Sequence, residues 1–561
     1  MSKVRTWRAT RDQTMGAKPN QKLFITYLIL ISSSLLVLVL TFKPLTLLSQ
    51  INSPAKITGL PSPPVTKNPK WLRLVGDFLP EKKRIRVGLL NVAENELESY
   101  EALGPSISET VHVPLVPLPE NLTWSNLFPE WVDEDHRWEV PKCPEIPLPE
   151  SADVDVVVAK IPCQGWSAKR GLRDVFRLQV NLAAANLAVE SGRREIDRTV
   201  YVVFVGFCGP MHEIFRCDER VRRVGDYWVY KPNLERLKQM LLMPVGSCDI
   251  ASPFAQSGKE ATTTAPPVTS TFGRGREAYV TVLHSSEAYV CGAIALAQSI
   301  RQSGSTRDLV LLHDDSLTNR SLSGLRAAGW ELRRVERIRS PLARKGSYNE
   351  WNYSKLRVWQ VTDYDKLVFI DADIVVLKNL DHLFFYPQLS AAGNDKDLFN
   401  SGVMVLEPSK CMFEDLKRKS LKIESYNGGD QGFLNENFVW WHRLSKRVNT
   451  MKFFGRSNPR RELSDGVYGV HYLGLKPWAC YRDYDCNWDM KPRRVFASDS
   501  VHGKWWGVYD RMSEELKGFC GLSPKTEGRI EKWRKISRGE GFDEGRHWEI
   551  RVKDPRKKIF H

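Results

Sequence analysis

Short runs of apolar residues alternate with longer amphipathic stretches in two separate parts of the chain. In the first part, strands are predicted over 84–92, 153–159 and 198–206, and a long helix over 168–190. In the second part, predicted strands at 278–283, 309–313 and 331–338 alternate with helices at 289–301, 321–328 and 353–361. This alternation is typical of α/β folds with parallel strands. We therefore expect two α/β units, an accessory module over 81–250 and a larger domain over 276–525.

The next apolar run, residues 366–377, is interrupted by two carboxylates. Its first half reads as a buried strand, and Asp371 and Asp373 follow immediately. Open α/β sheets bind ligands outside the carboxyl ends of their strands, so we expect these acids at a ligand site. On extended chain they would point the same way, and paired carboxylates suit Mg²⁺ or Mn²⁺ holding a diphosphate. A plain strand end with two solvated acids is the alternative interpretation.

The first 80 residues contain one long apolar run. Residues 23–42 carry no charge and are long enough to span a bilayer as a helix. Basic residues dominate 1–22, which predicts a cytosolic N-terminus and the bulk of the chain in the lumen, as in a single-pass type II membrane protein. A cleaved signal peptide is the alternative, but no small-residue cleavage site follows the run. Three further segments are expected to lack a core: a proline-rich stem at 43–80, a linker at 251–275 and a basic tail at 526–561.

Composition narrows the class of protein. The 561 residues carry a formal net charge of +16, much of it in the two terminal segments. No nucleic-acid-binding motif accompanies this charge, so we expect no nucleic acid partner, whereas acidic substrates fit it. An apolar content of 42% is enough for packed cores.

Ten cysteines are scattered along the chain without a CxxC motif, which argues against zinc or thioredoxin-type chemistry. An oxidising lumen would permit disulfides, and short spacings make Cys480 with Cys486 and Cys208 with Cys217 candidate pairs. Small buried hydrophobic residues are the alternative interpretation of these cysteines. Three N-glycosylation triplets, which would make the chain a glycoprotein, fit a luminal location: those beginning at Asn121, Asn319 and Asn352.

Two polar segments come after the two acids. Residues 399–405 read as a strand entered through a small polar turn, which could bond sugar hydroxyls or simply reverse the chain. Residues 427–434 read as a glycine-containing loop that opens a helix. Asp430 in this loop could cap the helix or bind a sugar.

The last polar segment, residues 471–478, combines a histidine with a lysine five residues later. The imidazole of His471 could complete a divalent metal site with Asp371 and Asp373, although a single histidine is often structural. Lys476 could neutralise a diphosphate.

Four motifs occur in a characteristic order: FIDADIVVL at 369–377, FNSGVMVLEPS at 399–409, NGGDQGFLN at 427–435 and HYLGLKPW at 471–478. This order resembles the glycogenin-like retaining glycosyltransferases of family 8. In the first unit, residues 86–98 and 173–186 are similar to plant UDP-glucuronate:xylan α-glucuronosyltransferases. The resemblance implies an α/β chain whose GT-A domain, a Rossmann-like nucleotide-sugar-binding fold, follows the accessory module and a single transmembrane helix.

Carried over by position, the resemblance implies roles for individual residues. Asp371, Asp373 and His471 would be Mn²⁺ ligands. Lys355 matches a lysine that the family uses on the donor, and Asp430 is a candidate nucleophile unless front-face attack needs none. Leu283 and Tyr289 match the region that holds the nucleotide. The other implied donor-site residues are Ala372, Asn400, Ser401, Gly402, Asn427, Gly428, Gly429, Gln431, Tyr472, Leu473, Gly474, Leu475 and Lys476.

The function implied is Mn²⁺-dependent transfer of glucuronic acid from UDP-glucuronate to xylan or xylo-oligosaccharides at the Golgi membrane, in plant cell-wall biosynthesis. Glycogenin has an aspartate where this chain has Asn427, and a neutral side chain would spare a uronate donor from like-charge repulsion. Alternatives are UDP-glucose or UDP-galactose as donor and another glycan or a lipid as acceptor. A non-enzymatic alternative is an inactive Golgi scaffold in a complex of glycan-synthesising enzymes, bound through module 81–250.

Overall fold

The computed structural model describes residues 69–79, 84–100, 107–130, 132, 134, 141–163, 173–193, 198–252, 275–395, 397–455, 458, 460–541 and 546–558. The predicted tail at 1–22, the predicted anchor at 23–42, most of the stem and residues 253–274 of the linker lie outside these ranges. Within the described ranges, no helix has both the length and the apolar character needed to cross a membrane. All described residues belong to one compact unit that begins at Thr66.

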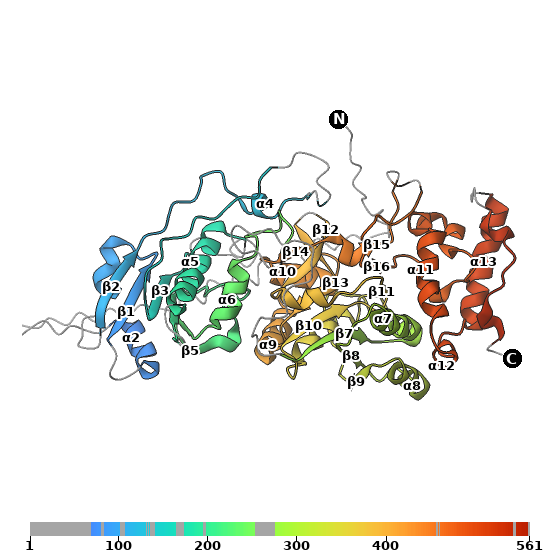
Figure 1. Cartoon of the computed structure of the whole chain (residues 1–561), viewed down its shortest axis with the longest axis horizontal. Coiled ribbons are helices and arrows are strands. Elements are labelled where there is room, and N and C mark those ends of the chain that lie inside the picture. The colour runs from blue at the N-terminus through green and yellow to red at the C-terminus, as the bar shows by residue number, and fades with distance from the viewer. Residues whose placement is uncertain are drawn as a thin grey trace, which may run out of the picture. The chain divides into compact units, whose positions relative to one another are not determined.

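The accessory module is built on a six-stranded sheet with the order β2-β1-β3-β4-β6-β5 (Figure 1). Strands β1 to β4 pair in parallel, and the β5–β6 hairpin adds two antiparallel strands beside β4. The strands are β1 (Ile85–Leu90), β2 (Ile107–Val113), β3 (Val156–Lys160), β4 (Tyr201–Val205), β5 (Arg220–Val224) and β6 (Tyr227–Tyr230). β4 is a continuous apolar run and β3 is apolar up to Lys160, as expected for parallel strands that are covered on both faces.

Successive residues of β3 face opposite layers of the module. Val157 lies in the apolar cluster that contains α5 (Val175–Gly192), whereas Val158 lies in a separate cluster with Trp71. Trp71 belongs to α2 (Lys70–Val75), which we predicted as part of an extended stem. That prediction is wrong for these residues, because Trp71 and Val75 cover an apolar sheet face and are fully buried. The shorter helices of the module are α3 (Leu97–Tyr100), α4 (Trp124–Leu127) and α6 (Leu234–Leu241).

The second domain contains a seven-stranded sheet with the order β14-β12-β13-β10-β7-β8-β9. Its strands are β7 (Glu277–Leu283), β8 (Asp308–His313), β9 (Glu331–Arg334), β10 (Lys366–Ile370), β12 (Ser390–Asp395), β13 (Leu398–Leu406) and β14 (His442–Leu444). The predicted parallel pairing holds for β10, β7, β8 and β9. The sheet as a whole is mixed, because β13 runs antiparallel to both β10 and β12. Only a hairpin can form where so few residues separate β12 from β13.

Helices and a small second sheet surround this domain. The helices are α7 (Val290–Gln302), α8 (Asn319–Ala327), α9 (Lys410–Lys419) and α10 (Asp430–Asn437). The second sheet has the order β11-β16-β15 and consists of β11 (Ile374–Val376), β15 (Thr450–Met451) and β16 (Gly469–His471). α7 packs closely against the turn after β10, since a Cβ atom at Gly292 would lie 2.5 Å from the carbonyl oxygen of Ala372.

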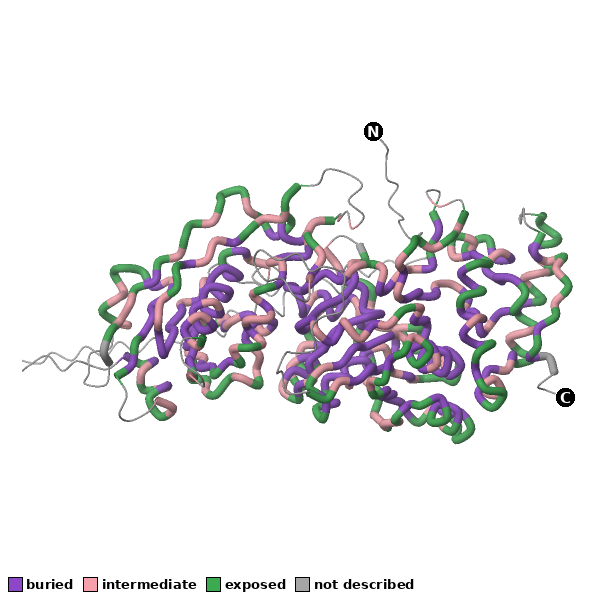
Figure 2. The backbone as a smooth tube through the Cα atoms, viewed as in Figure 1, coloured by how far each residue is buried: buried purple, intermediate pink, exposed green. Residues whose placement is uncertain are grey.

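The two domains share one hydrophobic core. A single cluster of buried residues contains Val157 and Phe204 from the first sheet together with Phe369 and Met404 from the second. Within each of the two sheets, Figure 2 shows the strands mostly as buried positions. A covalent bond and an ion pair also connect the two domains: a disulfide joins Cys217 to Cys411, and the Arg216 guanidinium lies 2.7 Å from the Glu407 carboxylate. The module is therefore an integral part of the folded unit.

The C-terminal segment is folded as well, contrary to the predicted tail at 526–561. Its helices are α11 (Asp499–Asp510), α12 (Glu514–Lys517) and α13 (Pro524–Glu540). α13 buries Ile530 in an apolar cluster with Tyr481 and Tyr484. Arg556 is fully buried, paired with Asp554 at 2.8 Å and donating to the carbonyl oxygen of Trp478 at 2.7 Å. The basic composition concealed these anchoring contacts.

All ten cysteines are paired: Cys143–Cys248, Cys163–Cys208, Cys217–Cys411, Cys291–Cys520 and Cys480–Cys486. The Cys480–Cys486 candidate is confirmed, whereas the Cys208–Cys217 candidate is wrong. Both residues of the second pair bond to partners that are distant in sequence, so their spacing carried no information. The alternative of unpaired buried cysteines is excluded.

Candidate active site

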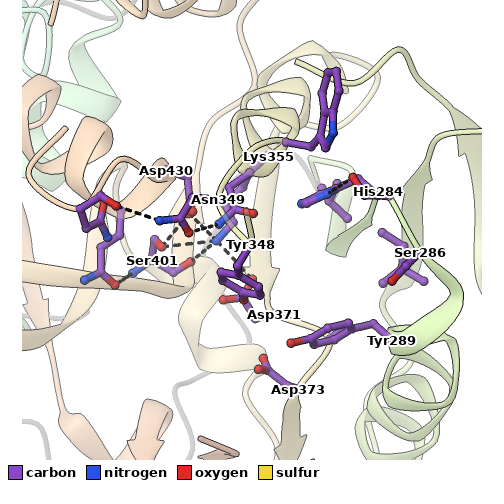
Figure 3. A pocket seen from close by; sticks show the side chains of 18 of the residues that line it. His284, Ser286, Tyr289, Tyr348, Asn349, Lys355, Asp371, Asp373, Ser401 and Asp430 are labelled. Atoms are coloured by element: carbon purple, nitrogen blue, oxygen red, sulfur yellow. Dashed lines mark hydrogen bonds and ion pairs between the residues drawn. The ribbon is translucent and has the colours of Figure 1, made fainter. Parts of the chain in front are cut away.

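The carboxyl ends of β7 and β10 and the first residues of β13 border a cavity of about 450 Å³. β13 runs antiparallel to β10, which brings its first residues to the sheet edge where Asp371 lies. Side chains from these strands, from η5 (Asn352–Gln360) and from the start of α10 converge there (Figure 3). The predicted residues that line the cavity are Leu283, Tyr289, Lys355, Asp371, Ala372, Asp373, Asn400, Ser401, Asn427, Asp430, Gln431, His471 and Leu473.

The two acids after β10 lie in a turn, whereas we expected extended chain. The backbone N–H of Ile374 donates to the carbonyl oxygen of Asp371 over 3.0 Å, and the N–H of Asp371 donates to Gly402 over 2.8 Å. The two side chains therefore do not point the same way by strand alternation, contrary to our prediction. The turn nevertheless brings their carboxylate oxygens close to each other. One carboxylate oxygen each of Asp371 and Asp373 and one ring nitrogen of His471 all lie within 4.8 Å of one another.

Strand pairing places His471 beside this turn. His471 is the last residue of β16 and is the register partner of Ile374 in β11. Its Nε2 lies 3.2 Å from Oδ1 of Asp373, and its Nδ1 lies 3.1 Å from Oδ1 of Asn449. A Cβ atom at Gly402 would lie 2.7 Å from the imidazole ring, so a larger residue there would displace the histidine.

Asn449 fixes which imidazole nitrogen carries the proton. Its amide nitrogen donates to Oδ1 of Asn400 over 2.8 Å, which leaves its own Oδ1 as the acceptor that faces Nδ1 of His471. Nδ1 must then carry a proton, and Nε2 is the nitrogen that faces Asp373. This arrangement is the usual outer shell of a metal-binding histidine. Asn449 belongs to no recognisable motif, and sequence reasoning missed it.

Lys476 does not line the cavity but pairs with one of the candidate ligands. Its Nζ lies 2.5 Å from Oδ2 of Asp373 and 2.5 Å from the carbonyl oxygen of Tyr472. Burial raises the pKa of Asp373, but Lys476 and His471 outweigh burial and hold this pKa below its usual range. Asp373 is therefore a permanent carboxylate.

A second ionic cluster lies on the other side of the turn. Nζ of Lys355 lies 2.6 Å from Oδ2 of Asp430 and 3.2 Å from Oδ1 of Asp371. The hydroxyl of Ser401 donates to the same Asp430 oxygen over 2.8 Å. Burial would raise the pKa of Asp430, but Lys355 and these hydrogen bonds lower it. Burial raises the pKa of Asp371 to about 6, with Lys355 opposing this shift and Asp373 adding to it.

Asn427 shapes the loop before α10. Its Oδ1 accepts hydrogen bonds from the hydroxyl of Ser425 over 2.9 Å and from the backbone N–H groups of Gly429 and Gly432 over 2.9 and 3.2 Å. The side chain thus organises the loop while also lining the cavity. Gly428 adopts a φ of +68°, which favours glycine in this tight loop.

Besides Lys476, six predicted donor-site residues do not line the cavity: Gly402, Gly428, Gly429, Tyr472, Gly474 and Leu475. Three of these residues, Tyr472, Gly474 and Leu475, pack against residues outside the cavity. Tyr472 is fully buried and donates to the carbonyl oxygen of Val501 over 2.9 Å. Leu475 packs in the cluster around Tyr481. Gly474 adopts a φ of +75°, and a Cβ atom there would lie 2.5 Å from the Asn487 side chain.

Two groups of lining residues were missed from the sequence. His284 and Ser286 directly follow β7, so the rule that located Asp371 at a strand end should also have found them. Residues 346–352 form a loop whose Tyr348 and Asn349 line the cavity. Asn349 donates to the carbonyl oxygen of Asn427 over 2.8 Å, which ties this loop to the one before α10. Only the fold reveals that contact, because the loop has no motif.

The donor set fits a divalent cation. Two carboxylates and an imidazole nitrogen are suitable ligands, and the three residues surround one point. The outer contacts from Asn449 to His471 and from Lys476 to Asp373 hold the ligands in place. Three carboxylates face two ammonium groups in the site, which leaves an excess of negative charge for a cation to balance.

Residues 65–248 match the family model described as GUX1-5 N-terminal domain, and residues 280–392 match the model described as Glycosyl transferase family 8. The chain is 67% identical to the Arabidopsis thaliana protein named Putative UDP-glucuronate:xylan alpha-glucuronosyltransferase 5, covering 97% of this chain and 99% of that protein. It is 49% identical to UDP-glucuronate:xylan alpha-glucuronosyltransferase 2 of the same plant, covering 85% and 81%. Inositol phosphorylceramide glucuronosyltransferase 1, also from Arabidopsis thaliana, is 40% identical over 46% of this chain and 50% of that protein.

The two domain matches and the nearly full-length relatives agree with one another. The first match covers the accessory module and the second covers β7, β10 and the turn with Asp371 and Asp373. The chain therefore belongs to the family of the UDP-glucuronate:xylan alpha-glucuronosyltransferases, within glycosyl transferase family 8, and is a glycosyltransferase of GT-A fold.

Proposed function

We propose that this glycosyltransferase moves glucuronic acid from UDP-glucuronate to xylan, using Mn²⁺ and retaining the configuration at the sugar. The observation that carries the proposal is the 67% identity along nearly the whole chain to a relative whose printed name states that donor and acceptor. The site supports it, because Asp371, Asp373 and His471 gather ligand atoms around one point beside a cavity. An inactive scaffold has no physical need for this arrangement.

Asp371, Asp373 and His471 would hold the cation. A bound divalent cation supplies positive charge that neutralises a diphosphate and makes it a better leaving group. Lys476, next to Asp373, would add a second positive charge where UDP departs. Both ligand carboxylates lie at the carboxyl end of β10, where nucleotides bind in open α/β sheets.

Lys355 and Asp430 would act on the sugar side of the cavity. The 2.6 Å ion pair with Lys355 and the hydrogen bond from Ser401 both occupy Oδ2 of Asp430. A carboxylate so engaged is better suited to positioning the donor than to forming a covalent bond. We therefore favour front-face attack by the acceptor hydroxyl, which needs no protein nucleophile. Lys355 would keep Asp371 and Asp430 in their places during the reaction.

We further propose that the enzyme is a type II protein of the Golgi membrane with a luminal catalytic domain. The uncharged run at 23–42 and the basic residues before it support this topology. The five disulfides are consistent with an oxidising lumen. Protease treatment of intact vesicles should leave the C-terminus protected, and cleavage from the cytosolic side would contradict the topology.

One experiment tests donor and acceptor together. The purified chain is incubated with Mn²⁺, xylohexaose and one of three donors: UDP-glucuronate, UDP-glucose or UDP-galactose. Mass spectrometry then measures the masses of the products. Addition of one glucuronosyl residue, only with UDP-glucuronate, is the expected outcome. Transfer of a hexose, or UDP release without any change of mass in the xylo-oligosaccharide, would contradict the proposal.

A lipid acceptor is the second candidate, because a relative named for inositol phosphorylceramide shares 40% identity over about half of the chain. The nearly full-length relatives argue for xylan, since their printed names state that acceptor and their matches include the accessory module. Adding inositol phosphorylceramide in micelles to the same assay separates the two acceptors.

A further inference from the structure

The accessory module contains a second cavity, separate from the active site. It has a volume of about 730 Å³ and lies at the carboxyl ends of the parallel strands β1, β2 and β3, beside the first turn of α5. β2 pairs with one edge of β1 and β3 pairs with the other, so the strand order changes direction at β1. Open α/β sheets bind ligands at such a point. The module therefore has a ligand cavity in the position that its topology favours.

The walls of this cavity are largely apolar and partly open to solvent. Phe176 is 39% exposed and Val116 is 46% exposed, and both line it. Three proline rings, those of Pro114, Pro117 and Pro162, add further flat apolar surface. Exposed apolar side chains that gather at one cavity indicate a ligand with an apolar face.

Polar groups are interspersed among these apolar walls. Gln179 is fully buried, and its Nε2 donates to the carbonyl oxygens of Val116 and Pro147 over 2.8 and 2.9 Å. These two bonds fix the orientation of the amide. Its Oε1 is buried and has no hydrogen-bond partner among the described residues. A buried acceptor without a partner is costly, so a hydroxyl group of a ligand would be a stabilising partner.

The charges around the cavity do not suit a phosphate. The loop after β1, residues 91–96, contains no glycine and carries Glu94 and Glu96 where a nucleotide-binding sheet would cradle phosphates. Lys160 is the lysine among the described lining residues, and its ammonium already lies 2.5 Å from the carboxylate of Glu96. The cavity therefore favours an uncharged ligand over a nucleotide sugar.

From these observations we propose that the accessory module binds an uncharged polysaccharide chain, the acceptor of the proposed reaction, at this second cavity. A pyranose ring offers an apolar face for Phe176 and the proline rings and hydroxyl groups for Gln179. Asp174 in the cavity wall and Glu94 in the neighbouring loop disfavour a chain that already carries uronate groups, so the cavity would prefer unsubstituted segments. The identification of the polysaccharide as xylan rests on the proposed function. The proposal that the cavity binds an uncharged glycan does not depend on that function.

The test uses the full chain in detergent micelles and the variants Phe176→Ala and Val116→Ser. Both residues are partly exposed, so the variants are expected to fold. Val221→Ala is the matched control, because Val221 is 40% exposed on β5, at the opposite edge of the same sheet. Electrophoresis through native gels that contain xylan, glucomannan or no polysaccharide measures binding without requiring activity.

We expect xylan to retard the wild-type chain and the Val221→Ala control. The Phe176→Ala variant should bind about five- to tenfold more weakly, as expected for the loss of one stacking contact, and Val116→Ser, which removes a smaller apolar contact, should also bind more weakly. The KM for long xylan should rise by the same factor, while kcat and the KM for xylotriose stay unchanged, since a short acceptor needs only the active site. Equal KM changes for short and long acceptors would indicate a general structural defect and would overturn the proposal.

The outcomes also separate this proposal from the proposed function. Suppose that the wild type transfers no sugar to xylan, but that a neutral polysaccharide retards the wild type more than it retards Phe176→Ala. The cavity proposal then stands, and the proposed acceptor is wrong. If the wild type transfers sugar to xylan and both variants bind and react as it does, the cavity proposal is overturned. A competitor added to the xylan gel gives a further outcome. If micromolar UDP abolishes the retardation of the wild type and xylohexaose does not, the cavity proposal is likewise overturned.

Discussion

The ammonium of Lys476 lies 2.5 Å from Oδ2 of Asp373, while the imidazole of His471 faces the other oxygen of the same carboxylate at 3.2 Å. One candidate metal ligand is thus held by two neighbours from the same β16–loop segment. Burial lowers the pKa of Lys476, but the charge of Asp373 outweighs burial and raises it, so the lysine stays protonated. A fixed positive charge therefore stands beside the place where a leaving diphosphate would develop its charge.

Replacing Lys476 by alanine should cost about 2–4 kcal/mol of transition-state stabilisation and lower kcat/KM for UDP-glucuronate accordingly. The reason is the loss of a preorganised positive charge on the leaving-group side. Steady-state kinetics on xylohexaose measures the effect. Lys491→Ala, which removes an exposed lysine, is the control. An unchanged kcat/KM in a folded Lys476→Ala variant would reject this role for the lysine.

The double variant Asp371→Asn/Asp373→Asn should neither bind Mn²⁺ nor transfer sugar, because only His471 would remain as a strong ligand. Mn²⁺ binding can be followed by electron paramagnetic resonance of the free ion, independently of turnover. Asp315→Asn removes an exposed acid that pairs with Arg334 and serves as the control. If the folded double variant binds Mn²⁺ as tightly as the wild type, the ligand assignment is wrong.

Asn449 should matter for metal binding although it touches no metal. The variant Asn449→Ala removes the acceptor of the His471 Nδ1 proton and should weaken Mn²⁺ binding about 10- to 100-fold. Asn449→Asp keeps a side-chain oxygen in the same position and should retain most of the affinity. Equal affinities of wild type and Asn449→Ala would show that the β11–β16 pairing alone orients the histidine.

The sequence predicted best those features that follow from local patterns. β7, β8 and β10 were found from apolar runs, and the place of Asp371 at a ligand edge followed from the end of β10. The turn at Asp371–Asp373 was not predictable by alternation, since apolar residues resume directly after it in β11. The ligands still meet, because β16 pairs with β11 and delivers His471 to the same point.

What the sequence did not reveal depends on contacts between distant segments. Asn449 and the loop 346–352 join the site through tertiary hydrogen bonds, and no spacing rule connects them to Asp371. Arg556 shows the same limit, because its basic neighbours suggested a solvated tail while its own side chain binds Asp554 in the interior. The shared core of the two sheets likewise requires knowledge of which apolar faces meet.

Asn427→Asp tests the proposed donor preference. An aspartate can accept the three hydrogen bonds that Asn427 receives, so the loop before α10 should keep its shape. The added negative charge lines the cavity and should disfavour the uronate by about 1 kcal/mol, or about fivefold in kcat/KM relative to UDP-glucose. Competition between the two donors in one reaction measures this ratio. An unshifted ratio would remove the repulsion argument while leaving the glycosyltransferase assignment intact.

His442 should make the stability of the folded chain depend on pH. Burial lowers the pKa of this histidine in β14 from its usual value of about 6.5 to about 4, so the unfolded chain binds a proton that the folded chain does not between these two values. Stability should therefore be complete above about pH 6.5 and should fall by up to about 3 kcal/mol as the pH drops toward 4. Urea unfolding followed by tryptophan fluorescence at several pH values measures the slope. His442→Phe keeps an aromatic ring against Trp440 but cannot titrate, so its slope between pH 6.5 and 4 should be smaller than that of the wild type. Identical slopes in the two proteins would assign the pH dependence to other groups, such as the buried Asp554–Arg556 pair.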